Sequence, residues 1–154
     1  MSAKYKLALS GVLVFCLFVI DRVLKFLFYK KFPQQEFFIL SDWLKLKLAF
    51  NPGIAFGLAV NYYLIIFIYI LILLALIWWL IKIYREKKYF SILCLQMVIA
   101  GAFSNLLDRL QLGQVIDYFD LKYYSVFNLA DVMIVCGVVG LLVVYGRKRK
   151  PPKQ

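Results

Sequence analysis

The sequence contains no histidine, and its three cysteines are scattered. Without histidine, neither a Ser-His-Asp nor a Cys-His nucleophile can form, and a His-Glu-x-x-His zinc site is excluded. Cys16, Cys94 and Cys136 lie far apart in apolar runs, which indicates neither a metal site nor a disulfide framework. Acidic residues are few, 8 against 19 Lys and Arg, and there is no glycine-rich phosphate loop. We therefore expect a chemistry that needs no metal and no cofactor.

Apolar residues are in large excess. Of the 154 residues, 64% are hydrophobic, against roughly 45–50% in a soluble domain. A water-soluble fold and a disordered chain are both excluded by this composition. The formal net charge is +11, but the basic residues flank hydrophobic runs and form no separate patch. Anionic membrane lipid is therefore the expected partner of these charges, and nucleic acid is not.

Four segments are long and apolar enough to cross a bilayer, which takes about 20 residues of helix. They span about 7–28, 62–81, 89–107 and 126–145. The first resembles a secretory signal, but no small-residue cleavage site follows it, so we expect it to remain in place. The sequence predicts an all-α polytopic membrane protein with four transmembrane helices. Without repeats or long linkers, residues 1–154 form one domain, which we expect to be monomeric.

The distribution of Lys and Arg predicts the orientation. The N-terminus, the 82–88 loop and the tail hold 11 basic residues and one acid. The segments 21–61 and 108–131 hold 8 basic and 7 acidic residues. Both termini are therefore expected in the cytoplasm, and the segments 21–61 and 108–131 are expected towards the outer side.

A small β element is predicted between the first two helices. Residues 43–50 alternate with a period of two, which places Leu44, Leu46, Leu48 and Phe50 on one face. The segment 36–40 can pair with it through a turn at 41–42. We expect this strand pair on the extracytoplasmic surface.

Polar residues of the predicted spans gather in one layer. An ionisable or amide group in a membrane helix is costly unless it is paired, so each is a functional candidate. With the orientation above, all of them fall in the outer half of the membrane or just outside it. They are Asp21, Lys25, Asn51, Asn105, Asp108, Arg109, Asp117, Asp120, Asn128 and Asp131. Ion pairs between helices and helix-end caps are the structural alternatives for several of them.

Carboxylates are the remaining catalytic resource. Asp131 is expected about five residues into the fourth helix, on the order of 8 Å below the outer boundary. Two adjacent carboxyl groups can share a proton, so that one activates water and the other protonates the substrate. The partner of Asp131 could be Asp21, Asp108, Asp117 or Asp120. Asp117 reaches Asp131 only if the chain turns back within 118–125, and periodicity does not choose among the four.

Five short blocks carry a family resemblance. Asn-Pro-Gly-Ile-Ala-Phe-Gly at 51–57, Asn-Leu-Leu-Asp-Arg at 105–109, Val-Ile-Asp-Tyr at 115–118 and Phe-Asn-Leu-Ala-Asp at 127–131 occur in order, after Asp21 and Lys25 at i,i+4. Together they resemble the conserved blocks of the bacterial lipoprotein signal peptidase (signal peptidase II) family. Four positions depart from the usual pattern. Ala100 and Ser104 replace glycine, Tyr118 replaces phenylalanine, and Val132 replaces serine.

The resemblance implies that Asp117 and Asp131 are the catalytic acids of an intramembrane aspartic endopeptidase. It implies substrate-binding or supporting roles for Asp21, Lys25, Asn51, Gly53, Asn105, Asp108, Arg109 and Asn128. The implied substrate is a prolipoprotein with a diacylglyceryl group on a cysteine, cut on the N-terminal side of that cysteine. The implied location is the bacterial cytoplasmic membrane, with the active site near the extracytoplasmic face.

Two other functions use the same residues differently. A small proton- or ion-coupled transporter could employ the buried acids as a relay, although the chain has no repeat symmetry and no polar track to the cytoplasm. A membrane scaffold could use the polar residues to join helices, but that leaves Asp131 without a basic neighbour on its own helix face.

Overall fold

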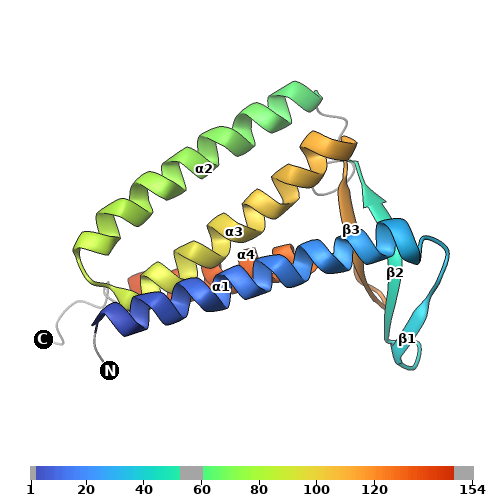
Figure 1. Cartoon of the computed structure of the whole chain (residues 1–154), viewed down its shortest axis with the longest axis horizontal. Coiled ribbons are helices and arrows are strands. Elements are labelled where there is room, and N and C mark those ends of the chain that lie inside the picture. Colours follow the sequence, from blue (N-terminus) through green and yellow to red (C-terminus); the bar gives the residue numbers. More distant parts are fainter. Residues whose placement is uncertain (1–2, 53–60, 148–154) are drawn as a thin grey trace, which may run out of the picture.

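The computed structural model describes residues 3–52 and 61–147. Four helices carry most of the chain: α1 (Ala3–Phe26), α2 (Tyr62–Arg85), α3 (Tyr89–Leu112) and α4 (Leu129–Arg147). A short π-helix, η1 (Leu27–Lys31), extends α1. Three strands complete the fold: β1 (Phe37–Leu40), β2 (Leu44–Asn51) and β3 (Val115–Leu121). The sheet lies at one end of the helices, opposite the start of α1 and the end of α4 (Figure 1).

Four helical segments are long and apolar enough to span a membrane, which confirms the predicted number. They are Tyr5–Lys31, Tyr62–Arg85, Tyr89–Leu112 and Leu129–Gly146. The first three run further than the sequence pattern suggested. Charged residues at their ends do not break them, because Lys25 and Asp108 pair inside the protein and Lys82 extends along the Trp78 ring.

The fourth helix begins later than predicted, at Leu129 and not at residue 126. Asp131 therefore lies in the first turn of α4, and the prediction that it lies five residues into the helix was wrong. The physical reason is that Asn128 accepts a hydrogen bond from the Asp131 backbone N–H (2.9 Å), which is the geometry of a helix N-cap.

The predicted strand pair is present, but the sheet has a third strand. β1 pairs antiparallel with β2, with Phe37 opposite Leu46. β2 also pairs antiparallel with β3, with Asn51 opposite Val115 and Ala49 opposite Asp117. This third strand, which contains both Asp117 and Asp120, was not predicted from the sequence. The run Val-Ile-Asp-Tyr-Phe has the β-branched and aromatic composition of a strand, and the chain turns back only after Leu121.

Helix α3 is the centre of the bundle and packs against α1, α2 and α4. More than half of its spanning window is buried, whereas the other three helices expose most of theirs. Their outward faces carry large apolar side chains, including Phe15, Trp78 and Leu142. Such faces suit hydrocarbon, because lipid takes the place of a further layer of protein. The polar groups are therefore concentrated where α3 meets its neighbours near the sheet.

Glycines allow α3 and α4 to approach closely. A Cβ atom on Gly101 would lie 2.4 Å from the backbone oxygen of Ala130. A Cβ atom on Gly137 would lie 2.5 Å from the backbone oxygen of Cys94. Small residues at such crossings let two helix backbones pack directly in a membrane. The crossing near Ala130 sets the distance between α3 and the first turn of α4.

The Gly101→Ala substitution is expected to destabilise the protein, because the added methyl group meets backbone that cannot rotate away. Overpacking of this kind costs about 1–3 kcal/mol. Thermal unfolding of the purified protein in detergent should show a lower midpoint. Gly11→Ala on α1 is the matched control, since nothing lies within 4 Å of its added Cβ atom. Equal midpoints for the two variants would contradict the close crossing.

Candidate active site

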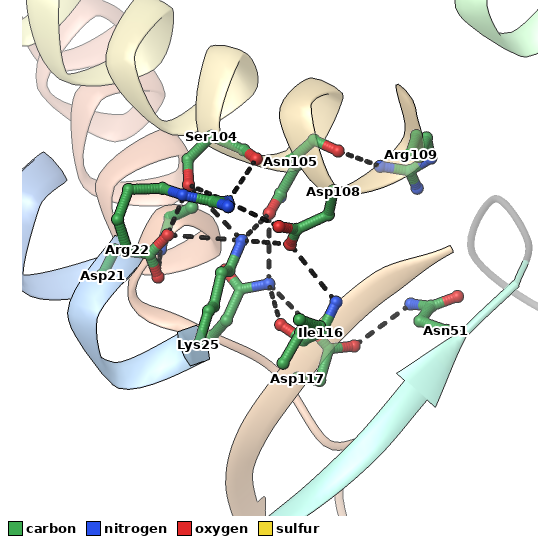
Figure 2. A network of polar contacts seen from close by, with 12 residues as sticks. Asp21, Arg22, Lys25, Asn51, Ser104, Asn105, Asp108, Arg109, Ile116 and Asp117 are labelled. Carbon is green, nitrogen blue, oxygen red and sulfur yellow. Dashed lines mark hydrogen bonds and ion pairs between the residues drawn. The ribbon is translucent and has the colours of Figure 1, made fainter. Parts of the chain in front are cut away.

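Nine of the predicted site residues lie in one region, at the junction of the helices with the sheet, and most of them are labelled in Figure 2. They come from five elements: α1, β2, α3, β3 and the start of α4, which includes the preceding residue Asn128. The residues are Asp21, Lys25, Asn51, Asn105, Asp108, Arg109, Asp117, Asn128 and Asp131. Gly53 lies outside the described residues. The predicted convergence of polar groups is therefore found in the fold.

Two of the acids form a buried ion cluster with two bases. Lys25 Nζ lies 3.2 Å from Asp21 and 2.8 Å from Asp108. Arg22 Nη1 lies 2.5 Å from the other oxygen of Asp108. Asp21, Lys25 and Asp108 are at most 1% exposed. Two negative and two positive charges balance, as a buried ionic group requires. The cluster joins α1 to α3.

Neutral donors and acceptors complete this cluster. Ser104 Oγ donates to Asp21 Oδ2 (2.5 Å), and Lys25 Nζ donates to the Asn105 side-chain oxygen (2.8 Å). The Ile116 backbone N–H donates to Asp108 Oδ2 (3.3 Å). This last bond ties the start of β3 to α3, directly beside Asp117. The ion cluster therefore fixes three elements relative to one another.

Three members of the network were not predicted from the sequence: Arg22, Ser104 and Tyr118. Helical spacing contained a signal for two of them. Ser104 and Asp108 are i,i+4, and Arg22 and Lys25 are i,i+3, so each pair shares a helix face. Helical spacing gives no such signal for Tyr118, because its role depends on β3, which the sequence did not predict.

The start of α4 is built as a reciprocal cap. The Asn128 side-chain oxygen accepts from the Asp131 N–H (2.9 Å), and Asp131 Oδ2 accepts from the Asn128 N–H (3.2 Å). This is the arrangement of a capping box, with Asn and Asp in place of the usual Ser and Glu. It holds the Asp131 carboxylate against the positive end of the helix dipole. The spacing of Asn128 and Asp131 thus has a direct structural reason.

Amide groups hold both remaining acids. The Asn105 side-chain NH₂ donates to Asp131 Oδ1 (2.8 Å). The Asn128 side-chain NH₂ donates to Asp117 Oδ1 (2.7 Å), and that of Asn51 faces Asp117 Oδ2 (3.3 Å; Figure 2). Asn128 therefore contacts both acids, one through its NH₂ group and the other through its oxygen and backbone.

The four acids of this region thus divide into two kinds. Asp21 and Asp108 are ion-paired, whereas no ion pair to Asp117 or Asp131 exists within residues 3–52 and 61–147. Burial, with a smaller contribution from the charge of Asp131, raises the pKa of Asp117 to about 6. Hydrogen bonds from Asn128 and Asn51 and the more distant charge of Lys25 oppose this rise. Two adjacent carboxyl groups in this state can share one proton.

A small cavity of about 240 Å³ opens beside Asp131 along α4. Its other lining residues are Tyr124, Phe127, Val132, Val135 and Cys136. Asp131 is partly exposed there, whereas Asp117 is only 2% exposed. A larger cavity of about 590 Å³ lies between α2, α3 and α4, but its lining includes none of the site residues. This cavity therefore gives access to Asp131 from the side of α4.

Comparisons with known proteins show which family this chain resembles. The family model described as "Signal peptidase (SPase) II" matches residues 13–146. The lipoprotein signal peptidase of Moorella thermoacetica is 33% identical over 149 residues, covering 92% of this chain and 97% of that protein. The lipoprotein signal peptidase of Desulfitobacterium hafniense (strain DSM 10664 / DCB-2) is 39% identical over 128 residues, covering 81% and 83%.

Solved structures share the fold. A bacterial membrane enzyme determined at 2.3 Å superposes with a TM-score of 0.83, at 24% identity over 96% of this chain and 94% of that one. A second, at 1.9 Å, gives a TM-score of 0.80 at 25% identity over 90% and 92%.

Replacing Lys25 by methionine is expected to destabilise the protein strongly. The variant leaves two buried carboxylates with one base, and breaking a buried ionic pair in this way costs about 3–5 kcal/mol. The free energy of unfolding in detergent measures the effect. Lys47→Met is the control, because Lys47 pairs with Asp120 at the surface, where a salt bridge contributes roughly 0–1 kcal/mol. A small loss for Lys25→Met would show that the cluster does not hold α1 to α3.

Proposed function

The chain belongs to the signal peptidase II family, and on this premise we propose that Asp117 and Asp131 are its catalytic dyad. As a member, it is an aspartic-type peptidase of lipoprotein signal peptides in a bacterial membrane. The alternative of a proton- or ion-coupled transporter receives no support from these relationships. The observation that supports this dyad is the difference in partners among the four acids. Asp21 and Asp108 form ion pairs with bases, whereas side-chain amides donate to Asp117 and Asp131.

The two acids are suited to different roles. Asp131 lies at the N-terminus of α4, accepts hydrogen bonds from Asn105 and from the Asn128 backbone, and lines the cavity beside this helix. Asp117 is buried and has a raised pKa, so it keeps its proton more readily. We therefore assign Asp131 as the base that activates water and Asp117 as the acid.

The reaction follows from these roles. Asp131 takes a proton from water while the water oxygen adds to the scissile carbonyl carbon, and Asp117 gives its proton to the carbonyl oxygen. In the collapse of the resulting diol, Asp131 passes its proton to the leaving nitrogen and Asp117 recovers one from the diol. The peptide C–N bond breaks, and both acids return to their starting state.

The substrate is proposed to be a prolipoprotein with a diacylglyceryl group on its cysteine, cut on the N-terminal side of that residue. Such a substrate is itself anchored in the membrane, so it must reach the site laterally. The exposure of Asp131 on the side of α4 supports this route. We propose that Asn51, Asn105 and Asn128 hold the dyad. We also propose that Arg109 and Gly53 have substrate-binding or supporting roles.

The active site is proposed to face the extracytoplasmic side, with both termini in the cytoplasm. The basic loop at 82–88 and the chain ends carry most of the excess positive charge, and such segments stay on the cytoplasmic side. In the structure, the start of α1, the 82–88 turn and the end of α4 lie away from the sheet (Figure 1). Anionic lipid headgroups are the proposed partners of these charges. We propose that a single copy of the chain, as one domain, is sufficient for activity.

Asp117→Asn and Asp131→Asn are each expected to abolish cleavage of a diacylated prolipoprotein, because neither variant can share the proton. Purified variants in detergent, assayed by the mobility shift of the cleaved product, test this. The control is Asp120→Asn on the same strand, since Asp120 pairs with Lys47 at the surface. If either dyad variant cleaves at a near-normal rate while remaining folded, that acid is not part of the dyad.

The value of kcat/KM should fall as the pH rises above about 6. The dyad works with one proton, and above the pKa of Asp117, about 6, that proton leaves and both acids are charged. The sign is therefore a loss of activity as pH rises, with a second loss in acid when both groups are protonated. A profile that stays flat from pH 5 to about pH 8 would contradict a shared proton at this site.

A further inference from the structure

Tyr118 lies next to Asp117 on β3 and is fully buried, with 0% exposure. Its hydroxyl donates to Asp21 Oδ1 (2.9 Å) and accepts from the Leu129 backbone N–H (3.0 Å). Its ring stacks on Phe28 with centroids 5.6 Å apart and an interplanar angle of 5°. The hydroxyl therefore joins the ion cluster of α1 to the start of α4.

The first turn of α4 depends on this link. The first N–H groups of a helix have no partner within the helix and need external acceptors. Here the Leu129 N–H donates to Tyr118, the Ala130 N–H to Asp21 Oδ1 (3.2 Å), and the Asp131 N–H to Asn128. Two of these three acceptors belong to the connected pair Tyr118 and Asp21.

Asp117 and Tyr118 contact the start of α4 at successive positions. Consecutive strand residues point to opposite faces, so the two side chains leave β3 on different sides. Asp117 contacts the side chain of Asn128, and Tyr118 contacts the backbone of the next residue, Leu129. This geometry fixes where α4 begins relative to β3, and hence where Asp131 lies relative to Asp117.

We infer that Tyr118 is a positioning residue for the dyad. Its hydroxyl acts through Asp21 and the first turn of α4. The inference rests on the proposed function of Asp117 and Asp131. The hydroxyl, and not the ring, makes the contacts with Asp21 and with the Leu129 backbone. It adds a tether that the ring alone does not supply.

The charged and titratable groups around this tether lie on several elements. Asp21, Arg22 and Lys25 come from α1, Asp108 and Arg109 from α3, Asp117 from β3, and Asp131 from α4. On β2, Lys47 pairs with Asp120 on the outer part of β3. Removing the hydroxyl removes none of these groups, which makes the substitution a test of position.

Tyr118→Phe is the test, because it keeps the ring and its stacking on Phe28. We expect kcat for a diacylated prolipoprotein to fall about fivefold, the equivalent of one lost hydrogen bond, with KM within about twofold of wild type. The alkaline limb of the pH profile should move to lower pH, because a loosened Asp131 raises the pKa of Asp117 less. Tyr123→Phe, on the same hairpin and 87% exposed, should match wild type.

A double-mutant cycle with Asp21→Asn separates positioning from general stability. If Tyr118 acts through Asp21, the second substitution should add little to the loss of kcat caused by the first. Tyr118→Phe with a lower thermal midpoint but unchanged kcat and pH profile would overturn the inference, and so would additive losses in the cycle. Failure of the proposed function is a different result, since wild type would then not cleave or the Asp117→Asn variant would.

Discussion

The N-cap of α4 is the interaction on which the active site depends. Asn128 binds Asp131 in both directions through the capping box, and its NH₂ group donates to Asp117 at 2.7 Å. Asn128 thus sets where α4 begins and contacts both candidate catalytic acids. In a soluble protein a helix cap contributes about 1 kcal/mol of stability. Here the same geometry also supplies the arrangement that the chemistry requires.

The second constraint is the cost of charge in a membrane protein. Four acids lie close together, and an unpaired buried carboxylate is costly. Pairing all four with bases would remove the site's capacity to share a proton. The structure instead pairs Asp21 and Asp108 with Arg22 and Lys25, and surrounds Asp117 and Asp131 with amides. An amide donates a hydrogen bond to a carboxylate without supplying a compensating charge, so the two proposed catalytic acids have hydrogen-bond partners but no ion pair among the described residues.

The sequence predicted the number of spans, the β1–β2 pair and most members of the polar layer, although Asp120 instead pairs with Lys47. These features depend on composition and local periodicity, which a single sequence records. The strand β3 was not predicted, because Asp117 and Asp120 interrupt its apolar run. Without β3, the partner of Asp131 could not be chosen by spacing, and only the family resemblance pointed to Asp117. The roles of Ser104 and Tyr118 likewise depend on contacts between residues about 80–100 positions apart.

The sheet and the ion cluster together explain how a protein with few internal polar groups holds a precise site at a bundle end. Helix ends in a membrane protein are the places where backbone groups lack partners, and here those groups become the framework. The ion cluster joins α1 to α3, the bond from Ile116 to Asp108 joins β3 to α3, and Tyr118 joins β3 to α4. A buried ionic cluster adds little net stability compared with apolar packing of the same volume. Its contribution is directional, because apolar residues could fill the space but could not orient β3 and α4 so that Asp117 and Asp131 contact the same asparagine.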